Sequence, residues 1–158
     1  MAGAAGALER GRESYAKRSW ADAHESLMRA DRVTPLAAED LELLATAAFM
    51  LGRDDDLVAA LERAHHAHLA AGAPLRAARS AFWAGMNLVV RGKLGPGTGW
   101  IGRAQRLVEH EEDCAERGYL LLPIMFRHEA AGDFAAAAAM AADAAAIGER
   151  FGLSLIHI

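Results

Sequence analysis

The sequence predicts an all-α fold, arranged as a right-handed solenoid of about four helix pairs. Alanine accounts for 38 of the 158 residues, and alanine loses the least side-chain entropy in a helix. Long β-branched runs are absent from the sequence, so a sheet has little support. Apolar residues make up 53% and charged residues 24% of the chain, as in a globular domain with a core.

The first helix pair is expected at residues 3–18 and 19–31. Ser19 is placed to cap the second of these helices, and Pro35 follows its end. Four apolar residues at spacings of three and four share one helix face. They are Trp20, Ala23, Leu27 and Ala30. This order of aromatic, small, large and small residues before a proline is typical of the second helix of a tetratricopeptide repeat.

The second helix pair is expected between Pro35 and Gly72. Its first helix ends at Gly52, a residue that favours the left-handed turn after a helix. Its packing face consists of Leu41, Leu44, Ala45, Ala48 and Leu51. Three aspartates, at 54–56, open the partner helix at the positive end of its dipole.

The third and fourth pairs follow the same pattern less regularly. A helix from Pro74 to Gly92 is followed by an expected loop at 95–99, a helix at 100–112 and an end at Gly118. The fourth pair is expected at 119–131 and 134–152. Small residues in the first helix of a pair, where two helices cross closely, fall at Gly11, Ala45 and Gly85. Their intervals of 34 and 40 residues predict an irregular array.

The last six residues do not fit the repeat pattern. We expect one repeat domain over residues 1–152 and an off-pattern, apolar tail over 153–158. A solenoid ordinarily ends in a polar capping helix, so the chain is interpreted as a fragment with a non-native tail. We expect this fragment to self-associate or to be only marginally stable through its last pair. The alternative is a terminal strand or a buried tail.

Charge and cysteine content exclude several classes of function. The net charge is −4 and no basic block is present, so no nucleic-acid contact is expected from this segment. Cys114 is the single cysteine and predicts no internal disulfide. No signal sequence is apparent, and the apolar run at 134–148 carries Asp143 and is expected to form a buried helix instead of a membrane span. A cytoplasmic location follows as the default expectation.

One glycine-rich stretch matches the G-x-G-x-x-G pattern of dinucleotide-binding proteins. It runs from Gly97 to Gly102. That fingerprint requires a preceding strand and a βαβ unit, and the sequence around it has helical periodicity. We interpret the stretch as an inter-helix loop and expect no cofactor.

A histidine-rich segment raises the question of metal binding or catalysis. Glu62 and His65 form a single Glu-x-x-His motif, with His66 and His68 close by. Histidines at these positions point in different directions around a helix, so we interpret the segment as a solvated, partly packed face without a metal. An enzyme using Glu62, His65 and His128 is the least favoured alternative, and no catalytic residue is assigned. The acidic run before Cys114 is expected to raise the pKa of its thiol.

The first helix of each pair is expected to line a concave groove that binds ligands. Aromatic and methionine side chains there make adaptable anchors. The candidate groove residues are Glu42, Thr46, Phe49, Arg79, Phe82, Trp83, Met86, Tyr119, Leu122 and Phe126. The alternative is that Phe82, Trp83 and Phe126 belong to the core.

Several segments occur together in an order that goes beyond a generic repeat. They include residues 11–16, 19–23, 36–42, 51–56, 61–68 and 114–120. In this order the chain resembles the tetratricopeptide-like region of actinobacterial LuxR-type transcriptional regulators, over residues 8–152. In that family a helix-turn-helix DNA-binding domain lies at the C-terminal end, and nothing in this sequence matches it.

The resemblance implies a module that binds a protein or a small effector and serves as the sensory region of a regulator. DNA binding would then belong to a domain outside these residues. The alternative is a free-standing tetratricopeptide interaction scaffold.

Overall fold

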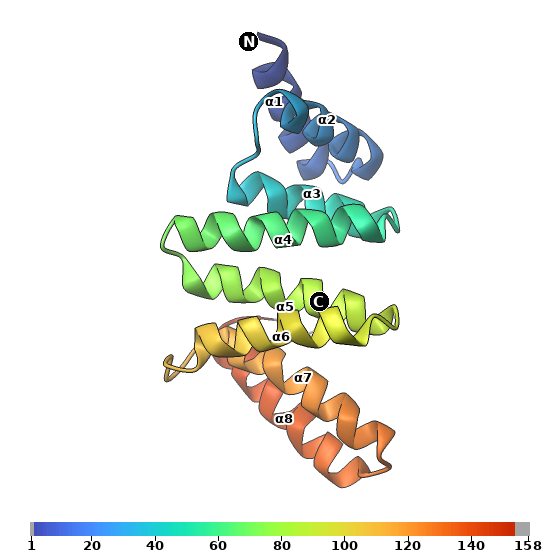
Figure 1. The fold of residues 1–158 in the computed structure, drawn as a ribbon, viewed down its shortest axis with the longest axis vertical. Coiled ribbons are helices and arrows are strands. Elements are labelled where there is room, and N and C mark those ends of the chain that lie inside the picture. The colour runs from blue at the N-terminus through green and yellow to red at the C-terminus, as the bar shows by residue number, and fades with distance from the viewer. Residues whose placement is uncertain (1, 154–158) are drawn as a thin grey trace.

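The computed structural model describes residues 2–153, and α-helices account for most of that range (Figure 1). The helices are α1 (Ala2–Ala16), α2 (Trp20–Val33), α3 (Ala38–Met50), α4 (Asp54–Ala70), α5 (Pro74–Val90), α6 (Leu94–Val108), α7 (Ala115–Ala130) and α8 (Phe134–Arg150). No strand occurs within these residues, so the all-α prediction is confirmed. None of the described helices is both long and apolar enough to span a bilayer.

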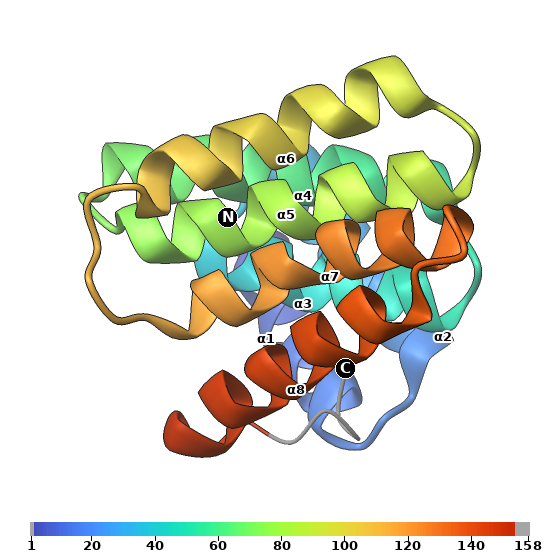
Figure 2. The same cartoon turned by 90° about the horizontal axis from the view of Figure 1, so that it is seen from below.

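Helices that follow one another in the sequence pack together, and the pairs stack along the long axis of the molecule (Figure 1). The turns within the second, third and fourth pairs lie at one edge of the stack, and the connections between these pairs lie at the opposite edge. Helices α3 to α6 run nearly parallel to one another, whereas α7 and α8 are inclined to them (Figures 1 and 2). The regular part of the array is therefore its middle.

Most helices end in the same tight turn. The residue two positions after α3, α4, α5, α7 and α8 is a glycine with φ between 65° and 78°. A side chain is disfavoured in this left-handed conformation, which explains why glycine occupies it. Gly52, Gly72 and Gly92 are 20 residues apart, so a helix pair with its two turns repeats every 40 residues.

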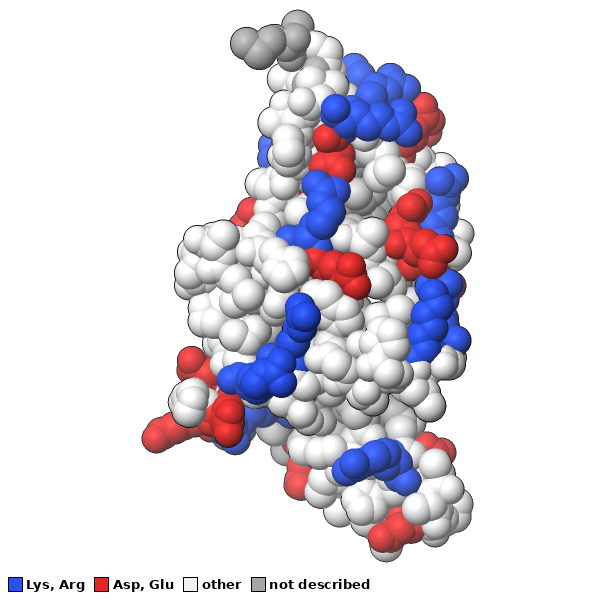
Figure 3. Space-filling view, in the orientation of Figure 1, with Lys and Arg blue, Asp and Glu red and all other residues white. Residues whose placement is uncertain are grey.

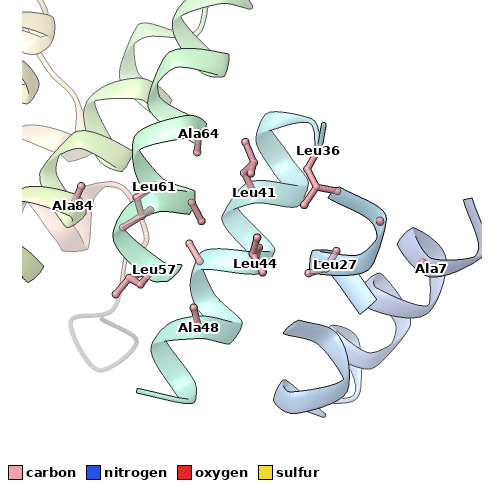
Figure 4. Packing of buried hydrophobic residues seen from close by; sticks show 13 residues of the cluster. Ala7, Leu27, Leu36, Leu41, Leu44, Ala48, Leu57, Leu61, Ala64 and Ala84 are labelled. Carbon is pink, nitrogen blue, oxygen red and sulfur yellow. The ribbon is translucent and has the colours of Figure 1, made fainter. Parts of the chain in front are cut away.

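Two contiguous hydrophobic clusters form the core. The first cluster extends from α1 to α5 and is built mainly from leucine and alanine (Figure 4). Leu27 on α2 is fully buried, and a Cβ atom on Gly11 would come within 2.8 Å of its side chain. The second cluster joins α5, α6 and α7 around Phe82. Trp83 and Trp100 contact both clusters and connect the two halves of the stack.

The glycine-rich stretch at 95–99 is helical, so the predicted loop is wrong. Helix α6 begins at Leu94, and Pro96 lies in its first turn, where a missing N–H costs no intrahelical hydrogen bond. Gly97 is buried against α5, and a Cβ there would lie 2.6 Å from Val89. Close helix packing, instead of a flexible connection, explains this glycine.

The end of the third pair also differs from the prediction. Helix α6 stops at Val108, and residues 109–114 form a longer connection to α7. Gly118, which the sequence suggested as a helix end, lies inside α7 and packs against Ile147 of α8. A Cβ atom on Gly118 would lie 3.1 Å from the Ile147 side chain. The acidic residues of this connection are exposed, except Glu111, which is half-buried.

One prediction about the first pair, the cap at Ser19, is corrected by the side-chain contacts. Ser19 occupies the N-cap position of α2, but its hydroxyl makes no capping hydrogen bond. Asp133 does cap a helix, α8, because its carboxylate accepts a hydrogen bond from the N–H of Ala136 at 3.1 Å.

Trp20 is only half-buried and packs edge-to-face on Tyr15, with ring centroids 5.4 Å apart. Leu27 is therefore the main anchor of α2.

The C-terminal boundary at residue 152 falls just after α8. The backbone N–H of Leu153 donates to the carbonyl oxygen of Gly148 at 2.8 Å, which closes the turn that ends the helix. The remaining residues of the expected off-pattern tail, 154–158, lie outside the described residues.

Candidate functional site

Arginine–carboxylate pairs connect the odd-numbered helices, which carry the predicted groove residues. Arg12 on α1 binds Asp40 on α3 through two hydrogen bonds of 2.8 and 2.9 Å. Arg79 on α5 binds Glu116 on α7 at 2.7 Å. The carboxylates of Asp40 and Glu116 are 5% and 7% exposed, whereas both arginines are nearly half-exposed. In each pair, therefore, the carboxylate is buried, and the arginine that compensates its charge remains partly exposed to solvent.

The pairing has an electrostatic consequence for Arg12. The hydrogen bonds to Asp40 raise the pKa of its guanidinium, and the carboxylate's charge adds to this effect. A buried carboxylate without such a partner would be costly, because burial removes its hydration. These pairs accordingly hold neighbouring helix pairs in register, and their charges compensate one another.

Glu42, the first predicted groove residue, has a structural role. One of its carboxylate oxygens accepts a hydrogen bond from His68 Nε2 at 2.7 Å, and the other accepts one from Arg76 at 2.7 Å. It therefore joins α3 to both α4 and α5. Thr46 is half-buried and donates its hydroxyl hydrogen bond to the Glu42 carbonyl oxygen within α3. Phe49 is 62% exposed near the end of that helix.

The predicted aromatic residues of α5 and α7 come together in one cluster. The Phe82 and Tyr119 rings stack with centroids 5.6 Å apart, and Trp83 meets each of them edge-on, at 5.0 and 5.5 Å. Phe82 is only 1% exposed and is covered by its neighbours, which supports the alternative that it belongs to the core. Trp83 and Tyr119 are half-buried and keep part of their surface in solvent.

Arg79 connects this aromatic cluster to the ion pairs. Its guanidinium carbon lies 5.9 Å from the centre of the Tyr119 ring while the group binds Glu116. Met86 and Leu122 are half-buried and pack against the same hydrophobic cluster, and Phe126 is 48% exposed one turn further along α7. The structure thus brings together the α5 and α7 members of the predicted groove. Glu42, Thr46 and Phe49 lie on α3, outside that aromatic cluster.

The histidine segment is more buried than the sequence suggested. His65 and His68 are 3% and 1% exposed, so the expected solvated face is wrong for both residues; His66 alone is exposed. His65 Nδ1 donates to the Ala77 carbonyl oxygen at 2.8 Å, and burial lowers the pKa of its imidazole. Within residues 2–153 no three histidine, cysteine or acidic side chains are placed to hold a metal ion.

The residues considered for catalysis are dispersed. His65 binds the first turn of α5, next to the α4–α5 connection, whereas His128 lies 3.7 Å from Asp133 at the α7–α8 turn. Figure 1 shows these two connections at opposite edges of the stack. Cys114 is buried, and burial, more than the nearby Glu116, raises the pKa of its thiol. This arrangement gives none of these groups a shared reaction centre.

Charges of both signs alternate over the visible face of the molecule. Figure 3 shows arginine and lysine side chains next to aspartate and glutamate side chains along the stack, without a continuous basic stripe. Ion pairs between helices include Arg63 with Asp31 at 2.6 Å and Arg76 with Glu39 at 3.0 Å.

Sequence reasoning missed the carboxylates and arginines that connect the pairs. Asp40, Arg76 and Glu116 were not singled out, because charged residues on a helix are usually solvated. A signal was nevertheless present in their separations. The acidic partners of Arg63 and Arg79 lie 32 and 37 residues away, close to the length of one repeat. Opposite charges at the repeat distance fall on equivalent helices of neighbouring pairs.

No protein-family model matches this chain, and no curated protein matches it.

Proposed function

We propose that this chain is a protein- or effector-binding helical repeat module of tetratricopeptide type. We further propose that it serves as the sensory region of a LuxR-type transcriptional regulator, with DNA contacted only by a domain outside these residues. The resemblance of the segments from 11–16 to 114–120 supports this context, and the stacked helix pairs are compatible with a right-handed solenoid. The chain is proposed to act by binding in the cytoplasm and to carry no catalytic residue.

The partly exposed aromatic surface between α5 and α7 is the main support for a binding role. Trp83 and Tyr119 each present part of a ring beside the Arg79–Glu116 pair, and Phe126 continues the apolar surface. We call these five residues the α5–α7 surface. Aromatic and arginine side chains supply most of the binding energy at protein interfaces, and a rigid helical support limits the entropy lost on binding.

Peptide selection on the intact chain tests this proposal. A random peptide library is selected against the 158-residue protein, and the affinity of the recovered peptides is measured for wild type and for Phe126→Ala. Removing an exposed anchor is expected to weaken binding about tenfold or more. Phe126 is already half in solvent, so its truncation should leave the fold intact.

Phe134→Ala is the matched control. Phe134 is 68% exposed in the same helix pair but begins α8, outside the α5–α7 surface. Its truncation should leave the peptide affinity within about twofold of wild type. If the recovered peptides bind wild type and Phe126→Ala equally well, or lose affinity equally with Phe134→Ala, the α5–α7 surface is not the binding site.

A further inference from the structure

A cleft of about 500 Å³ lies between α6 and α7, where the third and fourth pairs meet. It is lined by Gly102, Gln105, Arg106, Val108, Glu109, Arg117, Leu120 and Leu121. Its volume is within the range of sites that bind small organic molecules. None of these residues belongs to the α5–α7 surface, although that surface shares α7 with the cleft.

The cleft exists because the array is irregular at this point. The connection at 109–114 is longer than the three-residue turns elsewhere in the middle of the stack, and α7 is inclined to α6 (Figure 1). Such a junction leaves room for a ligand without the cost of opening a packed core.

Two guanidinium groups give the cleft a positive character. Arg106 has no carboxylate partner among residues 2–153, in contrast to Arg76 and Arg79, which are held by glutamates. Arg117 donates its Nε–H to the Glu111 carbonyl oxygen at 2.7 Å, so the rest of its planar group remains available. Helix α6 contains no acidic residue, and Glu109 supplies the one carboxylate of the lining.

The remaining walls are mostly apolar. Val108 and Leu120 are 4% and 8% exposed and continue into the second hydrophobic cluster, and Leu121 is half-buried beside them. Gln105 adds a neutral amide next to the arginines. The lining of the cleft therefore contains two guanidinium groups, which can bind an anion, and a short hydrophobic wall.

We propose that this cleft binds a small carboxylic acid with an apolar chain, its carboxylate on Arg106 and Arg117 and its chain against Leu120 and Leu121. On α7, Arg117, Leu120 and Leu121 lie on the side opposite Tyr119, Leu122 and Phe126, because successive helical residues are turned by about 100°. The cleft site is thus separate from the α5–α7 surface and does not depend on the function proposed for it.

Octanoate is a suitable probe, and backbone amide chemical shifts of the intact chain report where it binds. Saturable shifts are expected in residues 102–109 and 117–121. Arg106→Gln should weaken octanoate binding about tenfold or more, since a charge-assisted contact is lost, and Arg106→Lys should weaken it less. Glu109→Gln should strengthen it about threefold, because the opposing carboxylate is removed.

Arg103→Gln is the matched control for charge. Arg103 lies on α6 but stacks on Trp100, with its guanidinium carbon 4.5 Å from the ring, and does not line the cleft. Its loss should change octanoate affinity by less than about twofold. Unchanged circular dichroism melting of Arg106→Gln confirms that the variant is folded.

Three results would overturn the proposal. The first is that octanol binds as tightly as octanoate, because the carboxylate would then contribute nothing to binding and only non-specific apolar contact would remain. The second is equal loss of affinity in Arg103→Gln and Arg106→Gln, which would indicate a general charge effect. The third is the absence of shifts in 102–109 and 117–121 at about 10 mM octanoate, since even a millimolar site would then be largely occupied.

Discussion

Gly85 on α5 and Gly97 on α6 meet backbone to backbone. A Cβ on Gly85 would lie 2.7 Å from the Gly97 carbonyl oxygen, and one on Gly97 would lie 2.9 Å from the Gly85 carbonyl oxygen. Only glycine at both positions allows the two helices to approach this closely. This contact fixes the third helix pair, which supports the α5–α7 surface on one side and the α6–α7 cleft on the other.

The first prediction compares two glycines of the same helix. Gly97→Ala should destabilise the protein by about 1–3 kcal/mol, because the added methyl group forces α5 and α6 apart. Gly99→Ala should stabilise it by about 0.5–1 kcal/mol, since nothing lies within 4 Å of a Cβ at this position and alanine favours the helix. Urea denaturation measures both. Equal effects of the two substitutions would show that α6 does not cross α5 at Gly97.

The second prediction concerns the ion pairs between odd-numbered helices. Arg79→Ala should cost about 1–3 kcal/mol of unfolding free energy, because the Glu116 carboxylate is left buried without its partner. Arg29→Ala is the control, since Arg29 pairs with Glu25 on one exposed helix face and should cost less than about 0.5 kcal/mol. A loss for Arg79→Ala no larger than that of the control would contradict a structural role for the pair.

The third prediction concerns pH and His65. Burial lowers the pKa of His65 below its ordinary value of 6.5, so the unfolded chain binds this proton before the folded chain does. The stability contributed by neutral His65 is complete above pH 6.5 and is lost as the pH falls below it. His65→Gln should therefore flatten the fall in unfolding free energy between pH 7 and pH 5, as measured by urea denaturation at several pH values.

A histidine in the exposed connection serves as the control for this pH dependence. His110→Gln should keep the wild-type slope, because His110 lies outside the helices and is exposed. If His65→Gln and His110→Gln both retain the wild-type slope, burial of His65 does not contribute to the pH dependence.

The fourth prediction concerns the stability of the last pair. The buried residues of α8 are Ala137, Ala144 and Gly148, so this helix buries no large side chain, whereas α3 buries Leu41 and Leu44. Amide hydrogen exchange should accordingly be at least about tenfold faster in 115–150 than in 38–90, since sparse apolar packing permits local opening. Equal protection of the two regions would mean that the last pair is as stable as the middle of the array.

The helix pairs were largely predictable, because their ends carry strong local signals. Gly52, Gly72, Gly92 and Gly132 mark helix ends through a backbone conformation that other residues disfavour. The same reasoning failed at 95–99, where several glycines suggested a loop. Gly97 is required by a tertiary contact, because α6 packs closely against α5 at this residue. Local helix propensity does not reveal such a contact.

The candidate site was predictable only in part. The sequence pattern predicted that Trp83 and Tyr119 lie on the first helices of neighbouring pairs, and the structure brings their rings together. Burial of Phe82 and of His68 depended on neighbours from other pairs, which helical periodicity alone does not specify. The cleft beside Arg106 was not anticipated, because it arises from the inclination of α7 and the length of the preceding connection.

Hydrogen exchange with and without a selected peptide tests the central claim, which is that the α5–α7 surface binds the partner. The intact chain is labelled alone and with a saturating amount of a peptide recovered in the selection. The account predicts slower exchange in residues 79–86 and 116–126 and no change in 54–70. Protection confined to α6 or α8, with residues 79–86 and 116–126 unchanged, would contradict it.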